Sequence, residues 1–213
     1  MRNASRRAWT RLDLIVLTSV TVLLLCLGVL WILDARAKAR SICCNCNLKQ
    51  IGLAFKIWSS DHFGKFPMQV SVTNGGTMEL VMNGNVFPHF LAMSNELSTP
   101  FILVCPEDRA KRPLKEFTTN FDDSRISYFV GLDAVDSNPQ MFLSGDSNIT
   151  NGFEPQHKVL DLITNQSIGW TEKRHGAQGN IGFADGSVQQ FKNSGLNQAL
   201  LDSGVTTNRI AIP

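Results

Sequence analysis

The hydrophobic pattern of the chain begins with one long apolar run. Residues 14–33 are twenty consecutive residues without a charge, and a helix of that length spans about 30 Å, the thickness of a bilayer's hydrocarbon core. A cleaved secretory signal has a shorter apolar region, about 7–15 residues, that ends at small residues. Here the run ends at Trp31-Ile32-Leu33-Asp34. The pattern therefore predicts one transmembrane helix over 14–33.

The helical pattern continues beyond the apolar run. Residues 34–60 contain no proline and a single glycine, which permits a helix from about Leu12 to Ser60, roughly 70 Å long. Apolar residues recur there at spacings of four, three, four and three, which is one face of a helix: Cys44, Leu48, Ile51, Phe55 and Trp58. The stretch from Asp61 to Pro67 supplies turn residues that end the helix. We expect this face to pack on a folded domain.

After Pro67 the chain alternates between short apolar runs and turn residues. Strands are predicted at 70–72, 102–104, 126–130, 141–143, 168–170, 181–183 and 188–191, and helices at 87–97 and 194–203. Asp185-Gly186 between two of these runs predicts a two-residue type I′ hairpin with positive φ at both residues. The fold class is therefore α+β, with a long N-terminal helix on an antiparallel sheet. The expected organisation is a basic leader at 1–13, the membrane helix at 14–33, its exported continuation at 34–60 and an exported domain at 61–213.

The distribution of charge indicates how the membrane helix is oriented, but the net charge does not suggest a polyanionic partner. The chain has 20 Lys+Arg against 18 Asp+Glu, so a net charge of +2 gives no support for nucleic-acid binding. Four arginines precede the apolar run. Three basic residues, Arg36, Lys38 and Arg40, follow it, and the acidic Asp34 partly offsets their charge. This difference favours a cytoplasmic N-terminus and an exported C-terminal domain.

The segment before the membrane helix resembles the class III signal of type IV prepilins and type II secretion pseudopilins. The residues are Arg6-Arg7-Ala8-Trp9-Thr10-Arg11-Leu12-Asp13: a basic patch, a small residue, an aromatic residue and an acid. The resemblance implies that prepilin peptidase cuts between Ala8 and Trp9. It also implies that Asp13 neutralises the α-amine of a neighbouring subunit, because a carboxylate at the edge of the hydrocarbon needs a partner. From the residues alone, Asp13 could equally lie at headgroup level, paired with Arg11.

A second resemblance covers the chain to about Gln190. The helix segment Cys44-x-x-Asn47-Leu48-Lys49-Gln50-Ile51-Gly52 and the later Cys105-Pro106-Glu107-Asp108 resemble a bacterial pseudopilin-like family. Its signature is a histidine, nine residues and Asp-Gly, which here is His175 to Asp185-Gly186. The resemblance implies a pilin-like fold and a non-enzymatic subunit of the bacterial inner membrane. Such a subunit contacts lipid and other pseudopilins, in a type II secretion fibre, a type IV pilus-like fibre or another envelope complex.

The signature also has a reading from its residue types. Asp185 can bond its own backbone and Gly186 can take positive φ, so we expect His175, Asn180, Asp185 and Gly186 to build a hairpin and its brace. One histidine and one aspartate lack the further ligands that a zinc site needs. No nucleophile elbow, phosphate loop or zinc-protease motif occurs. The alternative function is a monomeric, signal-anchored module that binds calcium or a glycan in the periplasm.

Five cysteines leave two possibilities open. Cys26 lies in the membrane run, and Cys43 and Cys46 are i, i+3 on the helix, where a disulfide would be strained. A Cys44–Cys105 disulfide would tie the domain to the helix in an oxidising compartment, with Cys43 and Cys46 free. A metal site of Cys43, Cys46 and Cys105 is the alternative.

Calcium is the one cofactor that the composition of the domain raises. Asp133, Asp136 and Asp146 lie in a stretch rich in oxygen-bearing side chains, which are the ligands that calcium prefers. The same residue types are common in any surface loop, and no EF-hand spacing is present. No other cofactor is expected.

Overall fold

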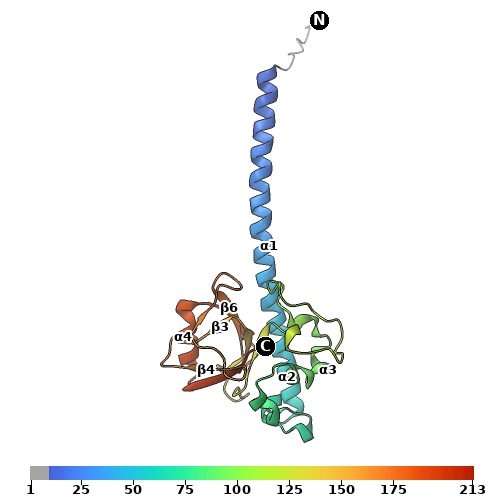
Figure 1. Cartoon of the computed structure of the whole chain (residues 1–213), viewed down its shortest axis with the longest axis vertical. Coiled ribbons are helices and arrows are strands. Elements are labelled where there is room, and N and C mark those ends of the chain that lie inside the picture. Colours follow the sequence, from blue (N-terminus) through green and yellow to red (C-terminus); the bar gives the residue numbers. More distant parts are fainter. Residues whose placement is uncertain (1–9) are drawn as a thin grey trace. The chain divides into compact units, whose positions relative to one another are not determined.

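The computed structural model describes residues 10–213, which fall into two compact units, residues 10–39 and Arg40–Pro213. The helix α1 (Arg11–Asp61) contributes residues to both units (Figure 1). We describe each unit by itself.

The first unit consists of the N-terminal part of α1. Thr10 precedes the helix and forms a capping box with Asp13: the Thr10 N–H donates to Asp13 Oδ2 (3.0 Å), and the Asp13 N–H donates to Thr10 Oγ1 (3.2 Å). The hydroxyls of Thr18, Ser19 and Thr21 donate to helix carbonyls three or four residues earlier. The polar groups of the run are thus satisfied within the helix, as a lipid environment requires.

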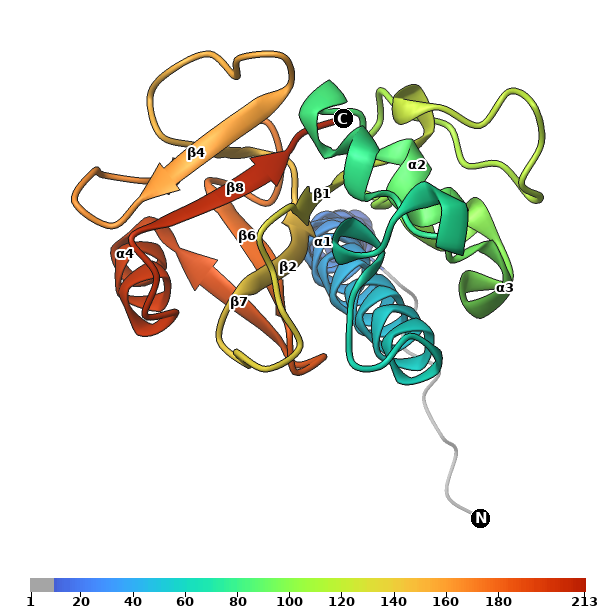
Figure 2. The same ribbon diagram turned by 90° about the horizontal axis from the view of Figure 1, so that it is seen from below.

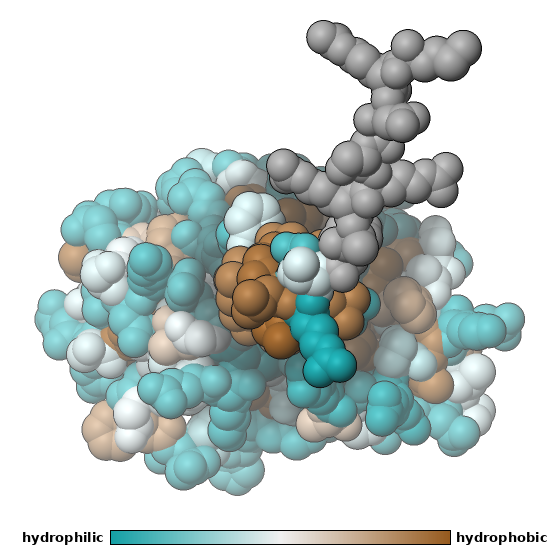
Figure 3. Space-filling view, turned by 90° about the horizontal axis from the view of Figure 1, so that it is seen from above, coloured by the Kyte–Doolittle hydropathy of each residue, from teal (hydrophilic) through white to brown (hydrophobic). Residues whose placement is uncertain are grey.

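The apolar side chains of this unit are exposed. Leu14, Leu25 and Trp31, for example, are 58%, 65% and 80% exposed, and Figure 3 shows the apolar side chains of the helix in brown. By length and composition, α1 contains a segment able to cross a membrane.

The second unit is built around the C-terminal part of α1. The predicted apolar face is correct, since Cys44, Leu48, Ile51, Phe55 and Trp58 are each at most 3% exposed. Figure 2 shows this part of α1 between the sheet and the segment that holds α2 (Phe87–Leu91) and α3 (Ser94–Leu97). The opposite face of the sheet is covered by α4 (Asn193–Asp202).

An antiparallel six-stranded sheet forms the second layer, so the α+β class is as expected. Its strands run in the order β4-β8-β1-β2-β6-β7. Their bounds are β1 Tyr128–Gly131, β2 Phe142–Asp146, β4 Val159–Ile163, β6 Gln178–Phe183, β7 Val188–Lys192 and β8 Thr207–Ala211. A separate pair joins β3 (Ile149–Thr150) to β5 (Gly169–Trp170).

The two faces of the sheet belong to two apolar clusters. In β1, Tyr128 and Val130 join the cluster of α1, whereas Phe129 joins the cluster of α4. This alternation is what a strand buried on both faces requires, because successive side chains point to opposite faces.

Several expected elements differ from the structure. The predicted strand at 102–104 overlaps a 3-10 helix, Pro100–Leu103, because Pro100 occupies its first turn and Thr99 Oγ1 accepts the Phe101 N–H. Of the predicted strand at 70–72, only Val70 and Ser71 lie between the 3-10 helices Pro67–Gln69 and Val72–Asn74, and Val72 begins the second one. The predicted helix 87–97 is two short helices, α2 and α3. Further 3-10 helices are Met78–Asn83 and Asp123–Arg125. The strands β3, β4 and β8 were not predicted.

Candidate functional site

The signature hairpin connects β6 to β7, but its turn is not the predicted type I′. The Gly186 N–H donates to the Phe183 carbonyl, and the Phe183 N–H donates to the Ser187 carbonyl, both at 2.9 Å. Gly186 has φ +86°, whereas Asp185 does not have positive φ. The loop is one with a single left-handed residue, as in longer hairpin connections. Asp185 Oδ1 accepts the Ser187 N–H at 2.8 Å, which is the expected bond to its own backbone.

The tip of this hairpin rests on α1 through two glycines. A Cβ added to Gly52 would lie 3.3 Å from both Cα and O of Gly186, closer than most Cβ contacts. A Cβ on Gly186 would lie 3.6 Å from Lys56 Cγ. Gly52 therefore allows the helix and the hairpin to approach backbone to backbone. The sequence signal for this contact is the single glycine of the helical stretch 34–60.

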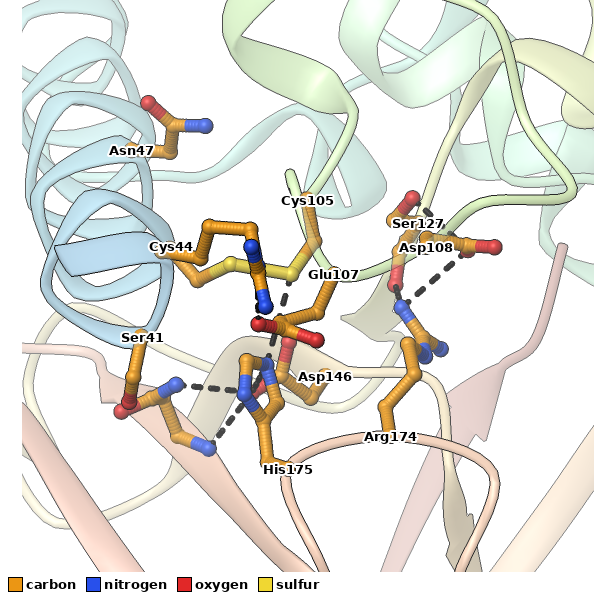
Figure 4. Close-up of a disulfide and its surroundings, with 12 residues drawn as sticks. Ser41, Cys44, Asn47, Cys105, Glu107, Asp108, Ser127, Asp146, Arg174 and His175 are labelled. Carbon is orange, nitrogen blue, oxygen red and sulfur yellow. Dashed lines mark hydrogen bonds and ion pairs between the residues drawn. A yellow bond between two sulfur atoms is a disulfide. The ribbon is translucent and has the colours of Figure 1, made fainter. Parts of the chain in front are cut away.

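His175 lies against a disulfide that joins Cys44 of α1 to Cys105 (Figure 4). The two Cα atoms are 5.2 Å apart, and both cysteines are fully buried. His175 Nε2 is 3.3 Å from Cys105 Sγ and 3.7 Å from Asp146 Oδ2, and its side chain is 2% exposed. The backbone is left-handed at His175, Gly176 and Ala177, with φ between 53° and 61°.

Asp146 and Asn180 form the brace beneath the histidine. Asp146 Oδ2 accepts the backbone N–H of Asn180 at 2.7 Å and its side-chain Nδ2 at 2.8 Å, linking β2 to β6. Both residues are buried, and Asp146 Oδ1 has no hydrogen-bond partner. Asp146 is thus the acceptor for Asn180, while the Asp185 carboxylate and the Gly186 N–H make their hydrogen bonds within the hairpin turn.

A buried arginine beside His175 was not found by sequence reasoning. Arg174 Nη1 donates to the Ser127 carbonyl at 2.9 Å, Nη2 donates to Ser147 Oγ at 2.5 Å, and Asp108 Oδ2 lies 3.3 Å from Nη1. Asn148 Nδ2 lies within hydrogen-bonding distance of the carbonyls of Thr171, Arg174 and Gln178. These contacts hold the loop that carries His175.

The aspartates considered for calcium are not brought together. Asp133 is paired with Arg209, with Oδ1 2.6 Å from Nη2, Asp136 is paired with Lys56, and Asp146 accepts from Asn180. Across residues 10–213, the one group of three His, Cys, Asp or Glu side chains placed to hold an ion is Cys44, Cys105 and His175. Within residues 10–213, Asp133, Asp136 and Asp146 therefore do not form a shared ligand cluster.

The remaining predicted residues lie elsewhere. Ala8 and Trp9 are outside the described residues. Asp13 forms the capping box with Thr10. Cys43 and Cys46 are exposed free thiols, and the proposed Cys43/Cys46/Cys105 metal set is not formed, because Cys105 is bonded to Cys44.

The arrangement around His175 does not have the geometry of a nucleophilic relay. In a Cys-His-Asp relay the acid contacts one ring nitrogen and the nucleophile the other. Here Cys105 and Asp146 both face Nε2. A groove of about 790 Å³ lies beside the cluster and is lined by Asn148, Thr171 and Arg174 among others.

Comparison of the chain with protein-family models, with curated proteins and with solved structures found no match.

Proposed function

We propose that this protein is a structural, pseudopilin-like subunit anchored in the bacterial inner membrane, with its N-terminus cytoplasmic and residues 61–213 in the periplasm. The observation that carries the proposal is that the two parts of α1 have different surroundings. Its N-terminal part exposes apolar side chains over a membrane-spanning length, whereas residues 44–58 bury one apolar face in the folded domain. One helix thus serves as both anchor and spine.

The surroundings of the signature support a structural role. The hairpin tip contacts Gly52, the disulfide joins Cys44 to Cys105, and Asp146 ties β2 to β6. The first two features join α1 to other parts of Arg40–Pro213, and the third joins two strands of the sheet. A subunit that transmits force or packs through its helix requires such a rigid joint.

The N-terminus of the mature chain tests the proposal. Mass spectrometry of the protein from a bacterial membrane should find an N-terminus at Trp9, methylated, after cleavage by prepilin peptidase. A host that lacks the peptidase is the control and should give the uncleaved chain. An uncleaved N-terminus in the presence of the peptidase would contradict the proposal.

Asp13 provides a second test, because its capping role and its charge can be separated. Asp13→Asn keeps an acceptor for the Thr10 N–H but removes the charge, whereas Thr10→Val removes the capping hydroxyl and keeps the charge. If the carboxylate pairs with a neighbour's amine, Asp13→Asn should abolish crosslinking into multimers and Thr10→Val should not. Equal crosslinking by both variants would contradict assembly through Asp13.

A second candidate is a monomeric, signal-anchored binding module. Two observations favour it: Asp13 already has a partner within its own chain, and a groove of about 790 Å³ is lined by polar side chains, among them Asn148, Thr171 and Arg174. Such a lining suits a hydroxyl-rich ligand such as a glycan. An uncleaved, monomeric protein that binds an oligosaccharide array, and whose Thr171→Val variant does not, would support it.

A further inference from the structure

The buried side chains around the disulfide form a donor set that the oxidised protein does not use fully. Cys44 Sγ, Cys105 Sγ and His175 Nε2 lie within 4.8 Å of one another. The nearest polar neighbours of Nε2 are a disulfide sulfur at 3.3 Å, which is a weak acceptor, and Asp146 Oδ2 at 3.7 Å, which is beyond hydrogen-bond range. The fully buried Asp146 also carries an oxygen, Oδ1, that no donor reaches.

Two thiolates, one imidazole and one carboxylate are ligands that zinc takes in proteins. We propose that the reduced form of this domain binds one Zn²⁺ through Cys44, Cys105 and His175, with Asp146 as the fourth ligand. Zn–S bonds of about 2.3 Å and a Zn–N bond of about 2.0 Å place sulfur and nitrogen roughly 3.5 Å apart at tetrahedral angles. Cys105 Sγ and His175 Nε2 already stand at 3.3 Å. Binding then requires that the two sulfurs separate to roughly 3.8 Å. It also requires that a carboxylate oxygen of Asp146, which lies outside the group of three, move closer to them.

Conversion of the disulfide form to the zinc-bound form requires a reductant, for example a dithiol. The reductant gives two electrons and two protons to the disulfide, so the sulfur–sulfur bond breaks, both cysteines become thiols and the reductant becomes a disulfide. Zn²⁺ then replaces the two thiol protons, which pass to solvent. Because the ion and the disulfide use the same two sulfurs, they exclude one another.

The rest of the domain holds these ligands in place in either redox state. Cys44 lies on the buried face of α1, Asn180 orients the carboxylate of Asp146, and Arg174 anchors the loop of His175. A metal site whose ligands are positioned by hydrogen bonds from neighbouring residues needs little reorganisation to fill. The proposed site therefore does not depend on assembly of the protein or on cleavage of its N-terminus.

Cobalt binding to the full-length protein in detergent tests the proposal. The protein carries Cys43→Ser and Cys46→Ser, so that the exposed thiols cannot contribute, and it is reduced with a phosphine. One equivalent of Co²⁺ should give the visible bands of a tetrahedral site and a thiolate charge-transfer band, and Zn²⁺ should displace it. The oxidised protein should give neither band.

Two variants in that background assign the ligands. His175→Ala should weaken Co²⁺ binding more than tenfold and Asp146→Asn about tenfold, whereas Lys173→Ala, in the same loop, should leave binding unchanged. Zn²⁺ should also protect Cys44 and Cys105 from alkylation and slow their reoxidation. The absence of a tetrahedral spectrum, or a His175→Ala variant within twofold of its parent, overturns the proposal. If reduction unfolds the metal-free domain, Zn²⁺ should restore the buried environment of Trp58 and Trp170, and failure to do so also overturns it.

Discussion

Removing the Cys44–Cys105 disulfide should lower the stability of the domain by an amount that the structure sets. The bridge joins residues separated by 61 positions, and closing a loop of that length contributes about 4 kcal/mol in the chain-entropy treatment. The unit Arg40–Pro213 is large enough that each kcal/mol corresponds to about 2–4 °C in Tm. Cys44→Ala/Cys105→Ala should therefore lower Tm by about 8–16 °C.

The assay is thermal unfolding of the full chain in detergent with a chelator present. Trp58 and Trp170 are 3% and 4% exposed, so their fluorescence reports the folded domain. Cys43→Ala/Cys46→Ala is the matched control, since both thiols are exposed and free, and its Tm should stay within about 1 °C of the parent. A fall of less than about 3 °C in the Cys44/Cys105 variant, or alkylation of Cys105 as a free thiol under non-reducing conditions, would refute the reasoning.

Three further perturbations probe other parts of the domain by urea denaturation. Gly186→Val should lower the free energy of unfolding by about 1–2 kcal/mol, because φ at this position is +86°. Gly186→Asn should lower it clearly less, since Asn tolerates positive φ, and equal losses for the two variants would contradict the turn assignment. Arg174→Lys should lower the free energy of unfolding by about 2 kcal/mol or more, because a lysine cannot replace the guanidinium contacts to Ser127, Ser147 and Asp108. Lys173 is exposed, so the control variant Lys173→Ala should leave stability nearly unchanged. Burial lowers the pKa of His89 to about 4, partly offset by Asp123, so between pH 6.5 and 4 the unfolded chain binds a proton that the folded chain does not. Stability should fall by up to about 3 kcal/mol as pH is lowered through that window, and His89→Gln should flatten the dependence; an unchanged slope would contradict it.

Elements with a clear period were predictable from the sequence. The buried face of α1 follows from apolar spacings of three and four, and once Cys44 is placed on that face, its pairing with Cys105 becomes reasonable. The runs around β1, β2, β6 and β7 were also recognised. Three-residue apolar runs did not predict strands reliably. The run 102–104, for example, is compatible with a strand and also with a 3-10 helix that begins at Pro100.

Elements stabilised by distant contacts were not predictable in this way. The strand β8 contains a buried Asn208 and an Arg209 that pairs with Asp133, 76 residues away. Arg174 and Asp108 are likewise far apart in sequence, and the residues next to each of them in the sequence do not indicate that the two form an ion pair. The conformation of the Asp185-Gly186 turn depends on the length of the whole β6–β7 connection, which the dipeptide alone does not determine.

The position of β8 has a consequence for how the domain reaches its folded state. β8 follows the other strands of residues 10–213 in sequence, yet it lies inside the sheet, hydrogen-bonded to β4 on one side and β1 on the other. Until residues 207–211 emerge from the ribosome, β1 and β4 each present an unpaired edge, and such edges are prone to pair with other chains. The six-stranded sheet can therefore close only after residues 207–211 have been synthesised, so that its central pairings form late.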